Sequence, residues 1–241
     1  MAASPSGRSA RAATDAVDSG STGRPPLSRE VIFAAALRVV DEHGLDALTM
    51  RRLGKELDRD PMSLYRHAIN RAALLDGVAE FVLDQLVIPN GDGGWRAQLR
   101  RTANDFRNLC LEHPNVVPLV VTRPPATPLG LRPIGTLRPL EQVLAVLITA
   151  GFPPVTALHL YRAYFALLYG YVLNELQETV TDAEESKDLL RIGLRRLPPT
   201  EFIHIRGLET ELGDHDGAAE LELGLDLLLT GIDHTLNTPP S

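Results

Sequence analysis

Residues 46–76 read DALTMRRLGKELDRDPMSLYRHAINRAALLD and contain two short apolar-periodic segments separated by a turn. Thr49 can cap the first helix, and Asp60 followed by Pro61 combines an N-cap with a proline at the first helical position. We expect this second helix to end at Asn70 and another helix to begin directly after it. The spacing therefore predicts a helix-turn-helix unit.

The helix that begins at Pro61 has one apolar side and one side suited to nucleic acid. Leu64 and Ala68 fall on the inner side, where they can pack against two leucines of the preceding helix. The outer groups are a thioether, a hydroxyl, a phenol, a guanidinium and an imidazole, from Met62, Ser63, Tyr65, Arg66 and His67. These groups suit base edges and phosphates, and no acidic residue follows Pro61 before Arg71. DNA binding explains this set better than a solvated surface helix does.

The formal charge is divided unevenly along the chain. The net charge is −7, but residues 1–73 carry +2 and residues 74–241 carry −9. Four further cations flank the outward helix where a duplex backbone would pass, namely Arg51, Arg52, Lys55 and Arg71. The asymmetry indicates a division of labour between a DNA-reading part and an acidic part.

The 241 residues divide into three parts. Residues 1–26 are rich in Ala, Ser, Gly, Pro and Arg with almost no large apolar side chain, which predicts a disordered tail. Residues 27–73 form the expected helix-turn-helix domain, and residues 74–241 form a larger domain. The pattern from Ser28 onward is helical, with no alternating run that favours a sheet, so we predict an all-α fold.

The remaining helices are expected from apolar periodicity and from proline and glycine punctuation. Ser28 can cap the first helix of the chain, and Gly44 is placed to end it. The later helices are predicted at Trp95–Glu112, Ile134–Ala150, Pro154–Glu178, Pro199–Leu212 and Ala218–Leu236. Residues 122–133, TRPPATPLGLRP, predict a long loop.

The composition points to an intracellular protein. The single cysteine, Cys110, cannot form an intramolecular disulfide, and the N-terminus lacks the apolar segment of a secretory signal. The longest apolar run, Ala163–Leu173, is too short to cross a bilayer and predicts a buried helix. We therefore expect a cytoplasmic protein with no membrane span.

Residues 27–78 resemble the N-terminal domain of the TetR family of one-component transcriptional repressors. The L-Y-x-H core of that domain is intact as residues 64–67. Further along, Trp95–Phe106, the TRP of residues 122–124, the AGF of residues 150–152 and the YGYVL segment follow the order of the ligand-binding half of the tetracycline-repressor subgroup. The resemblance covers about residues 27–236.

The resemblance implies a homodimer that places its third helices in successive major grooves of a palindromic operator. The implied DNA contacts are Arg51, Met62, Ser63, Tyr65, Arg66, His67 and Arg71. We assign Arg66 to base reading, and Ser63 and Tyr65 to phosphate. The helices 154–178 and 218–236 would pack across the two-fold axis as a four-helix bundle, so we expect Leu225 and Leu229 in the subunit interface.

The ligand half is expected to hold an apolar cavity with few polar groups. The predicted lining is Thr102, Phe106, Leu119, Arg123, Leu140, Val143, Leu144, Tyr161, Phe165 and Asn174, of which about half could be plain core. Tetracycline-responsive members bind a magnesium-chelated drug through two histidines, but this chain has Leu119–Val121 and Leu86–Val87 at those places. We therefore expect no metal and no cofactor, and an apolar or aromatic small-molecule effector.

Two other functions remain as alternatives. A small-molecule-binding helical enzyme would need a catalytic constellation, and the sequence has no G-x-S-x-G, H-E-x-x-H or phosphate-cradling loop. Its nearest candidate is Asp214-His215-Asp216, which a solvated turn explains more simply. An architectural DNA-binding protein would rely on phosphate contacts, which the acidic rear half opposes. A ligand-responsive transcriptional repressor is the function that the sequence favours.

Overall fold

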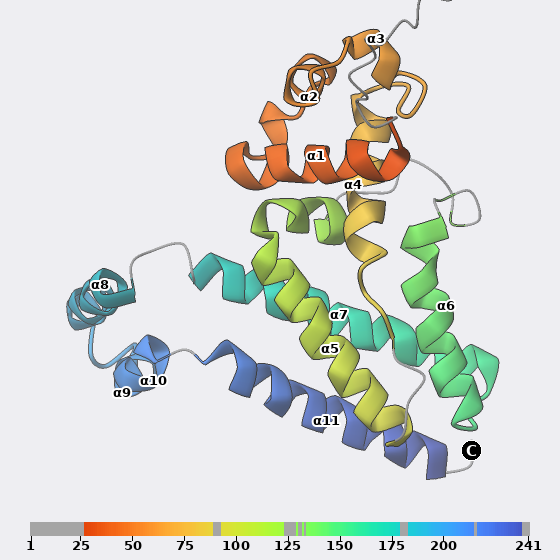
Figure 1. The fold of residues 1–241 in the computed structure, drawn as a ribbon. Coiled ribbons are helices and arrows are strands. Elements are labelled where there is room, and N and C mark those ends of the chain that lie inside the picture. The colour runs from red at the N-terminus through yellow and green to blue at the C-terminus, as the bar shows by residue number, and fades with distance from the viewer. Residues whose placement is uncertain are drawn as a thin grey trace, which may run out of the picture.

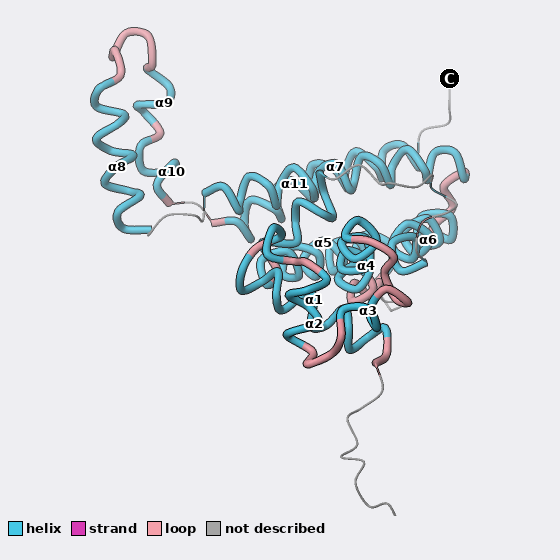
Figure 2. Tube along the Cα trace, turned by 90° about the horizontal axis from the view of Figure 1, so that it is seen from above, coloured by secondary structure: helices cyan, strands magenta, loops and turns pink. Residues whose placement is uncertain are grey.

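The computed structural model describes residues 27–88, 93–122, 129, 132, 134–178, 183–214 and 216–237, and these residues form helices and no β-strand (Figure 1). The prediction of an all-α fold is confirmed. The predicted tail and most of the proline-rich loop lie outside the described residues. A small head, residues 27–70, sits above a larger body, and an arm, residues 183–214, extends to one side (Figures 1 and 2).

The head contains α1 (Arg29–His43), the single turn η1 (Leu45–Ala47), α2 (Met50–Glu56) and α3 (Pro61–Leu64). The predicted caps are confirmed. Ser28 Oγ accepts from the amide of Val31 at 3.2 Å, and Thr49 Oγ1 accepts from the amide of Arg52 at 3.1 Å. α1 ends at Gly44, as the sequence predicts.

The expected extent of the third helix was wrong. α3 ends at Leu64, and the chain then forms a separate turn in which the amides of His67 and Ala68 both donate to the Leu64 carbonyl. Asn70 does not end this helix but begins the next one, since its Oδ1 accepts from the amide of Ala73 at 2.8 Å. An extended Asn in this position is a strong N-cap.

α4 (Arg71–Leu83) joins head and body (Figure 1). It packs against α1 at one end and against α6 at the other. Its buried residues lie on several sides of the helix, at Leu74, Leu75, Gly77, Val78, Ala79 and Val82. Glu80 forms an ion pair with Arg29 of α1 and accepts from the amide of Gly135 at 3.2 Å. One side chain of α4 therefore contacts both the head and the body.

The body contains α5 (Gly94–Glu112), the turns η2 (Pro114–Val116) and η3 (Pro118–Thr122), α6 (Ile134–Thr149), α7 (Pro154–Glu178) and α11 (Gly217–Asn237). The predicted bounds of α7 are confirmed, those of α5 and α6 differ by one residue at one end, and those of α11 differ by one residue at each end. Every helix of the described residues is too short or too polar to cross a membrane.

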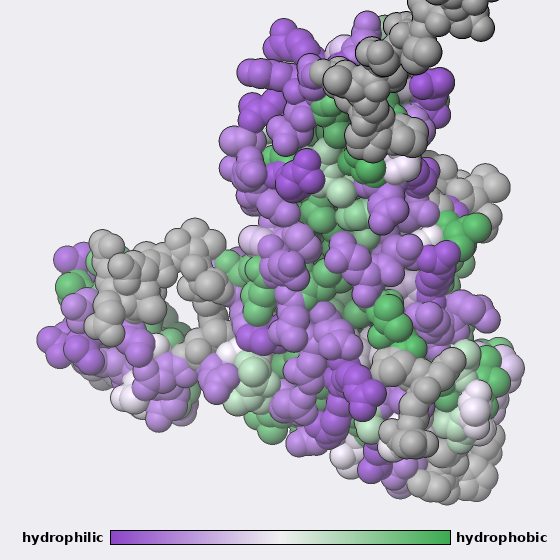
Figure 3. Space-filling model, in the orientation of Figure 1, coloured by the Kyte–Doolittle hydropathy of each residue, from purple (hydrophilic) through white to green (hydrophobic). Residues whose placement is uncertain are grey.

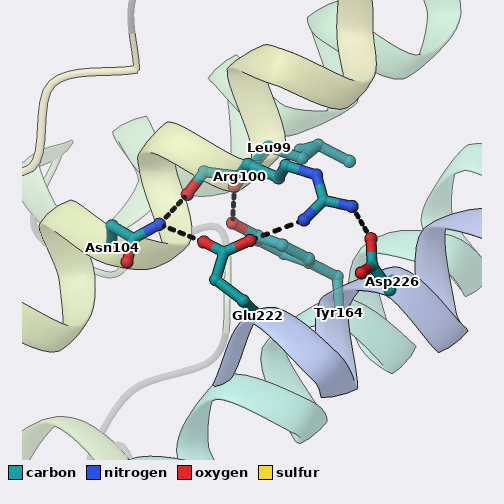
Figure 4. A network of polar contacts seen from close by, with 6 residues as sticks. All are labelled: Leu99, Arg100, Asn104, Tyr164, Glu222 and Asp226. Carbon is teal, nitrogen blue, oxygen red and sulfur yellow. Dashed lines mark hydrogen bonds and ion pairs between the residues drawn. The ribbon is translucent and has the colours of Figure 1, made fainter. Parts of the chain in front are cut away.

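Polar contacts hold α5 against α11 (Figure 4). Arg100 forms ion pairs with Glu222, at 2.5 Å, and with Asp226, while Asn104 Nδ2 donates to Glu222 at 2.8 Å. Arg96 adds a pair with Asp233 at 2.5 Å. These contacts fix the rotation of α11, because they place its acidic side toward α5.

A buried ion pair joins α5 to α7. Arg107 Nε donates to Glu175 Oε2 at 2.9 Å, and both side chains are largely buried. Tyr171 donates to the carbonyl of Gly217 at 2.7 Å, which brings the first turn of α11 to the same place. The Glu175 carboxylate raises the pKa of the Arg107 guanidinium against the opposing effect of burial. The Arg107–Glu175 pair therefore stays charged and holds α5 to α7, while the Tyr171 hydrogen bond holds α7 to α11.

The arm differs from the expectation for residues 199–212. It contains α8 (Ala183–Arg196), which the apolar spacing did not predict, and two short helices, α9 (Ile203–Gly207) and α10 (Glu209–Gly213), in place of one. α8 packs on α9 and α10, and the pairs Lys187–Asp214 (2.7 Å) and Arg191–Glu209 (2.8 Å) tie the two sides together. The arm projects away from the body (Figure 2).

The expected faces of α11 were also wrong. Leu225 and Leu229 are 0% and 2% exposed because they pack into the body of their own chain. The outward leucines are Leu223 and Leu227, which are 62% and 72% exposed. The rotation of α11 follows from its ion pairs with α5. Because Glu222 and Asp226 bind Arg100, Leu225 and Leu229 face the body and Leu223 and Leu227 face outward.

The packing of α1 on α4 generates a stability prediction. A Cβ atom added to Gly77 would overlap the ring of Phe33, which is buried. Displacing a buried ring costs about 1–3 kcal/mol, which exceeds the roughly 1 kcal/mol that Ala gains over Gly in a helix. We expect Gly77→Ala to lower the free energy of unfolding by about 1–2 kcal/mol in urea titrations.

Gly193 of α8 is the matched control, because a Cβ there would meet nothing within 4 Å. Gly193→Ala should leave the free energy of unfolding unchanged or raise it slightly. Equal stability of Gly77→Ala and the wild type would show that Phe33 can move without cost.

Candidate nucleic-acid interface and ligand site

The turn between α2 and α3 brings the two helices close together. Asp58 adopts a positive φ of 50°, which Asp tolerates better than most residues. A Cβ on Gly54 would lie 2.9 Å from the carbonyl oxygen of Arg59 and 3.0 Å from Pro61, so only glycine permits this approach. Asp60 then caps α3 by accepting from the amide of Met62 at 2.8 Å.

The two sides of residues 61–68, which form α3 and the turn after it, are as the sequence predicts. Leu64 and Ala68 are buried in the core of the head with Leu53. Met62 is 71% exposed, and Tyr65 and Arg66 are also exposed, while Ser63 and His67 are half-buried. The Ser63 hydroxyl donates to the carbonyl of Asp60 at 2.6 Å and keeps its lone pairs for another donor.

The outward surface of α2 and of the turn after α3 carries positive charge without described acidic partners, and the part of the head around α2 is mostly hydrophilic (Figure 3). Arg51, Arg52, Lys55 and Arg66 are all exposed, and none forms an ion pair with a residue that the structure describes. The nearest acid on α2, Glu56, faces Arg38 at 3.7 Å. Four cations without acidic partners on one small surface form a site for a polyanion.

Arg71 has a structural role in addition to the phosphate contact that the sequence predicts. Its Nε donates to the carbonyl of Leu48 at 3.1 Å, and Nη2 donates to the carbonyl of Leu45 at 2.8 Å. These bonds hold the turn between α1 and α2 against the start of α4. A phosphate contact by Arg71 stays a prediction, and it would have to share these donors.

An aromatic cluster lies between α5 and α7. The Phe165 ring lies 4.8 Å from that of Tyr161, 5.5 Å from that of Tyr169 and 6.1 Å from that of Phe106, measured between ring centroids. Tyr169 also contacts Phe106 at 5.7 Å. Tyr169 was absent from the expected lining, although its spacing of four residues from Phe165 could have indicated it.

The structure brings three of the predicted ligand residues into direct contact in the aromatic cluster, namely Phe106, Tyr161 and Phe165. Leu119, Val143 and Leu144 belong to, or pack against, the core that runs through head and body. Thr102 is buried, with its hydroxyl donating to the carbonyl of Gln98 at 2.9 Å, and Leu140 is half-buried. Asn174 is exposed on α7, apart from this group, and Arg123 lies outside the described residues.

The polar atoms in this region are few. Tyr164 donates to the carbonyl of Leu99 at 2.7 Å (Figure 4). The hydroxyls of Tyr161 and Tyr169 make no hydrogen bond to a described residue. Gln142 Oε1, on α6, is buried and also lacks a partner in the described part of the chain. Buried polar groups without partners are rare in folded proteins and commonly bind a ligand or water.

Burial determines the ionisation of the groups around this cluster. It raises the pKa of the Cys110 thiol to about 12, and it raises the pKa of Tyr161, Tyr164 and Tyr169 above the usual tyrosine value. The positive charge of Arg132 partly opposes this rise at Tyr161 and Tyr169. The thiol and phenols are therefore neutral at physiological pH.

The described residues contain no cluster of side chains suited to a metal ion. The places where the resemblance implies metal-binding histidines hold Leu86–Val87 and Leu119–Val121, and among these Leu86 and Leu119 are buried. The other candidate cation site was the run Asp214-His215-Asp216. In the structure Asp214 pairs with Lys187, and Asp216 caps α11 by accepting from the amides of Ala218 and Ala219. Its third member, His215, lies outside the described residues.

Two family models match the chain. Residues 32–78 match the bacterial regulatory proteins of the tetR family, and residues 89–236 match the tetracyclin repressor-like C-terminal domain. The tetracycline repressor protein class G of Vibrio anguillarum is 29% identical over 210 residues, which cover 86% of this chain and 94% of that protein.

Two Streptomyces proteins are also similar to the chain. The transcriptional repressor DrrR1 of Streptomyces coeruleorubidus is 33% identical over 54% of this chain and 52% of its own length. The crystal structure of ActR from Streptomyces coelicolor, in complex with actinorhodin, has a TM-score of 0.74 and 27% identity. That match covers 89% of this chain and all of ActR.

The neutral phenols and thiol generate a pH prediction. An acid whose pKa is raised by folding loses its proton first in the unfolded state, so it destabilises the fold at high pH. We expect the free energy of unfolding to be independent of these groups below about pH 9 and to fall as the pH rises toward 12. Urea titrations at a series of pH values measure this.

Tyr169→Phe is a suitable comparison because the Tyr169 hydroxyl makes no hydrogen bond to a described residue. The variant should lose less stability at alkaline pH than the wild type, since one titrating group is gone. An identical alkaline loss in both proteins would mean that Tyr169 ionises normally in the folded state.

Proposed function

The chain belongs to the TetR family of ligand-responsive transcriptional repressors, and we propose that it binds a palindromic operator as a homodimer and is released by an aromatic small molecule. The observation that carries the proposal is the combination of an exposed basic surface, formed by α2 and the turn after α3, with an aromatic cluster in the body. Operator binding places the proposed activity in the cytoplasm.

The reading surface supports the assignment of DNA contacts. The turn after α3 offers the exposed Arg66 for a bidentate contact to guanine, and α3 itself offers the exposed Met62 for an apolar contact to a base. Arg51 and Arg52, at the start of α2, are suited to phosphates beside the groove. The larger acidic body would repel DNA elsewhere, which favours docking through the head alone.

Exposed apolar and small residues support a dimer through α7 and α11. Gly224 of α11 lies against Leu167 of α7, which makes the outward faces of the two helices neighbours. On α11 this face carries Leu223 and Leu227, and on α7 it carries Ala163, Ala166 and Gly170. Small residues on one helix and leucines on the other permit close packing against a second copy.

The arm carries further apolar surface, which would be exposed to solvent in a monomer. Its exposed large residues are Leu189, Ile192, Ile203, Ile205, Leu208 and Leu212. The arm connects α7 to α11, the two helices of the proposed interface. Apolar surface of this extent next to an interface helix favours assembly over a monomer.

The aromatic cluster supports an aromatic effector. Stacked or edge-on aromatic rings are suited to a planar ligand, and the hydroxyls of Tyr161 and Tyr169 can orient its polar groups. The similar protein ActR was solved in complex with actinorhodin. We propose an aromatic effector, bound without a divalent cation because apolar residues stand where the resemblance to the tetracycline-repressor subgroup implies metal-binding histidines.

Release follows from the position of α4 between the two halves. Glu80 and the Asp84–Arg138 ion pair attach α4 to the start of α6, and the other end of α4 packs on α1. A ligand that binds better when α4 has moved favours a dimer whose α3 helices no longer fit successive major grooves. The effect on operator affinity is limited by the ligand's preference between the two states, about 1–3 kcal/mol.

The experiment that tests the function begins by selecting duplexes from a random DNA pool with the purified protein. The selected operator is then titrated with and without actinorhodin, in the presence of EDTA. We expect an inverted repeat, weaker binding with actinorhodin, and no effect of EDTA. Selection without an enriched inverted repeat would refute operator binding, whereas release that needs a divalent metal would refute the metal-free effector site.

Arg66 provides the prediction for base reading. Arg66→Ala should cost about 1–3 kcal/mol of operator affinity and relax specificity at one position in each half-site, because a bidentate base contact is lost. Fluorescence anisotropy with operator variants measures both effects. Arg101→Ala, an exposed arginine of α5, is the matched control and should bind like the wild type. Uniform weakening on every sequence would assign Arg66 to phosphate.

Leu227 provides the prediction for the dimer. Leu227→Asp places a charge on the proposed interface without disturbing the core, so it should shift the protein to monomers in sedimentation experiments. Ile134→Asp changes an equally exposed apolar residue on α6 and should remain dimeric. A wild-type monomer at micromolar concentration, or a dimeric Leu227→Asp, would contradict the proposed interface.

A further inference from the structure

The C-terminal end of α1 is bound by the segment that follows α5. Asn115 Nδ2 donates to the carbonyl oxygens of Val40, at 3.1 Å, and Asp41, at 3.0 Å. His113 Nδ1 lies 2.9 Å from Asp41 Oδ2. The Val40 carbonyl also accepts from the amide of Gly44 at 2.8 Å, so Asn115 is a second donor to Val40 and supplies the Asp41 carbonyl with a donor from another part of the chain. We call these residues the α1 junction: Val40, Asp41, His113 and Asn115.

The α1 junction is packed as well as hydrogen-bonded. The His113 side chain is 12% exposed, and Val116 and Val117 beside it are buried in the main core. Figure 1 shows this stretch of chain passing directly beneath α1. It is therefore a second contact between head and body, separate from α4.

One atom of the junction is not satisfied. Asp41 Oδ1 is buried without a hydrogen-bond partner among the described residues. A buried carboxylate oxygen of this kind costs free energy that an open, hydrated junction would recover. The contact is therefore less stable than a fully paired one, as a contact that opens and closes in a switch must be.

α5 connects the junction to the ligand half. His113 directly follows α5, and Phe106 of the aromatic cluster is seven residues earlier, about 10 Å along the helix axis. α5 is held along its length by the Arg100 network to α11 (Figure 4) and by the Arg107–Glu175 pair to α7. A displacement of α5 by a ligand thus reaches α1 without passing through α4.

We propose that the α1 junction is a second link, parallel to α4, through which the body sets the angle of the head. This inference rests on the proposed function, because a fixed head angle matters for reading successive grooves. His113 and Asn115 act as positioning residues that need not contact DNA or effector. If α4 were the single attachment, the head could pivot about it. Because the α1 junction is a second attachment, the angle of the head relative to the body follows the position of α5.

The decisive variant is Asn115→Asp. It keeps the shape of the side chain but replaces the donor with a carboxylate that faces two helix C-terminal carbonyls, which repel it. Asn108→Asp is the matched control, since Asn108 is an exposed residue of α5 and receives the same change of charge. His113→Asn tests rescue, because its amide can replace Nδ1 as the donor to Asp41.

The first readout is the distance between head and body within one chain, without DNA or effector. Spin labels are placed at Lys55→Cys on α2 and Arg101→Cys on α5, and labelled chains are diluted with unlabelled protein. Pulsed electron resonance should show a narrow distribution for the wild type, Asn108→Asp and His113→Asn, and a broadened or shifted one for Asn115→Asp. A distribution unchanged in a folded Asn115→Asp protein would overturn the proposal.

The second readout is DNA affinity. Asn115→Asp should bind the selected operator about tenfold more weakly while retaining its affinity for random duplex DNA, since the reading surface is intact. Loss of both affinities together with a lower melting temperature would indicate a merely structural role and overturn the proposal. Failure of the proposed function is distinct from this, because the wild type itself would then fail to prefer the operator.

Discussion

The structure depends on the burial of α4 by two different partners. A helix of 13 residues has little stability alone, and α4 has apolar residues on several sides. It exists as a helix because α1 covers one end and α6 the other. The head and the body therefore share one core, and Gly77 against Phe33 shows how closely the two are fitted. A shared core makes independent motion of the two parts expensive, which is the requirement for coupling a ligand site to a reading surface.

Local chemistry in the sequence was sufficient for much of this architecture. Ser28, Thr49 and Asp60 cap the helices that the sequence predicts, because capping depends on a few neighbouring residues. The long body helices also followed from their apolar spacing. The end of α3 did not, since the turn after Leu64 depends on how the head closes and not on local propensity. α8 was missed because half of its residues are charged and its apolar side is narrow.

Rotation about a helix axis was harder to predict than the helix itself. α11 has leucines on more than one side, so the sequence could not tell which meet its own body. The answer depends on residues far away in the chain: Arg100 binds Glu222 and Asp226, which turns Leu225 inward and Leu227 outward. The rotation of α7 was equally hard to predict. Phe106 and Phe165 do lie in one cluster, as expected, but Asn174 is exposed and Tyr169 was overlooked.

The arm is built differently from everything around it. Its helices are tied to one another by Lys187–Asp214 and Arg191–Glu209, and its buried Leu194 lies outside the main core. A change in its length or sequence would therefore leave the packing of α5, α7 and α11 intact. In evolutionary terms the arm is an exchangeable module: insertions, deletions and new surface residues can accumulate there while the remaining helices stay under the constraint of a common core. Divergence between relatives should concentrate between α7 and α11, where the chain can vary most without losing its fold.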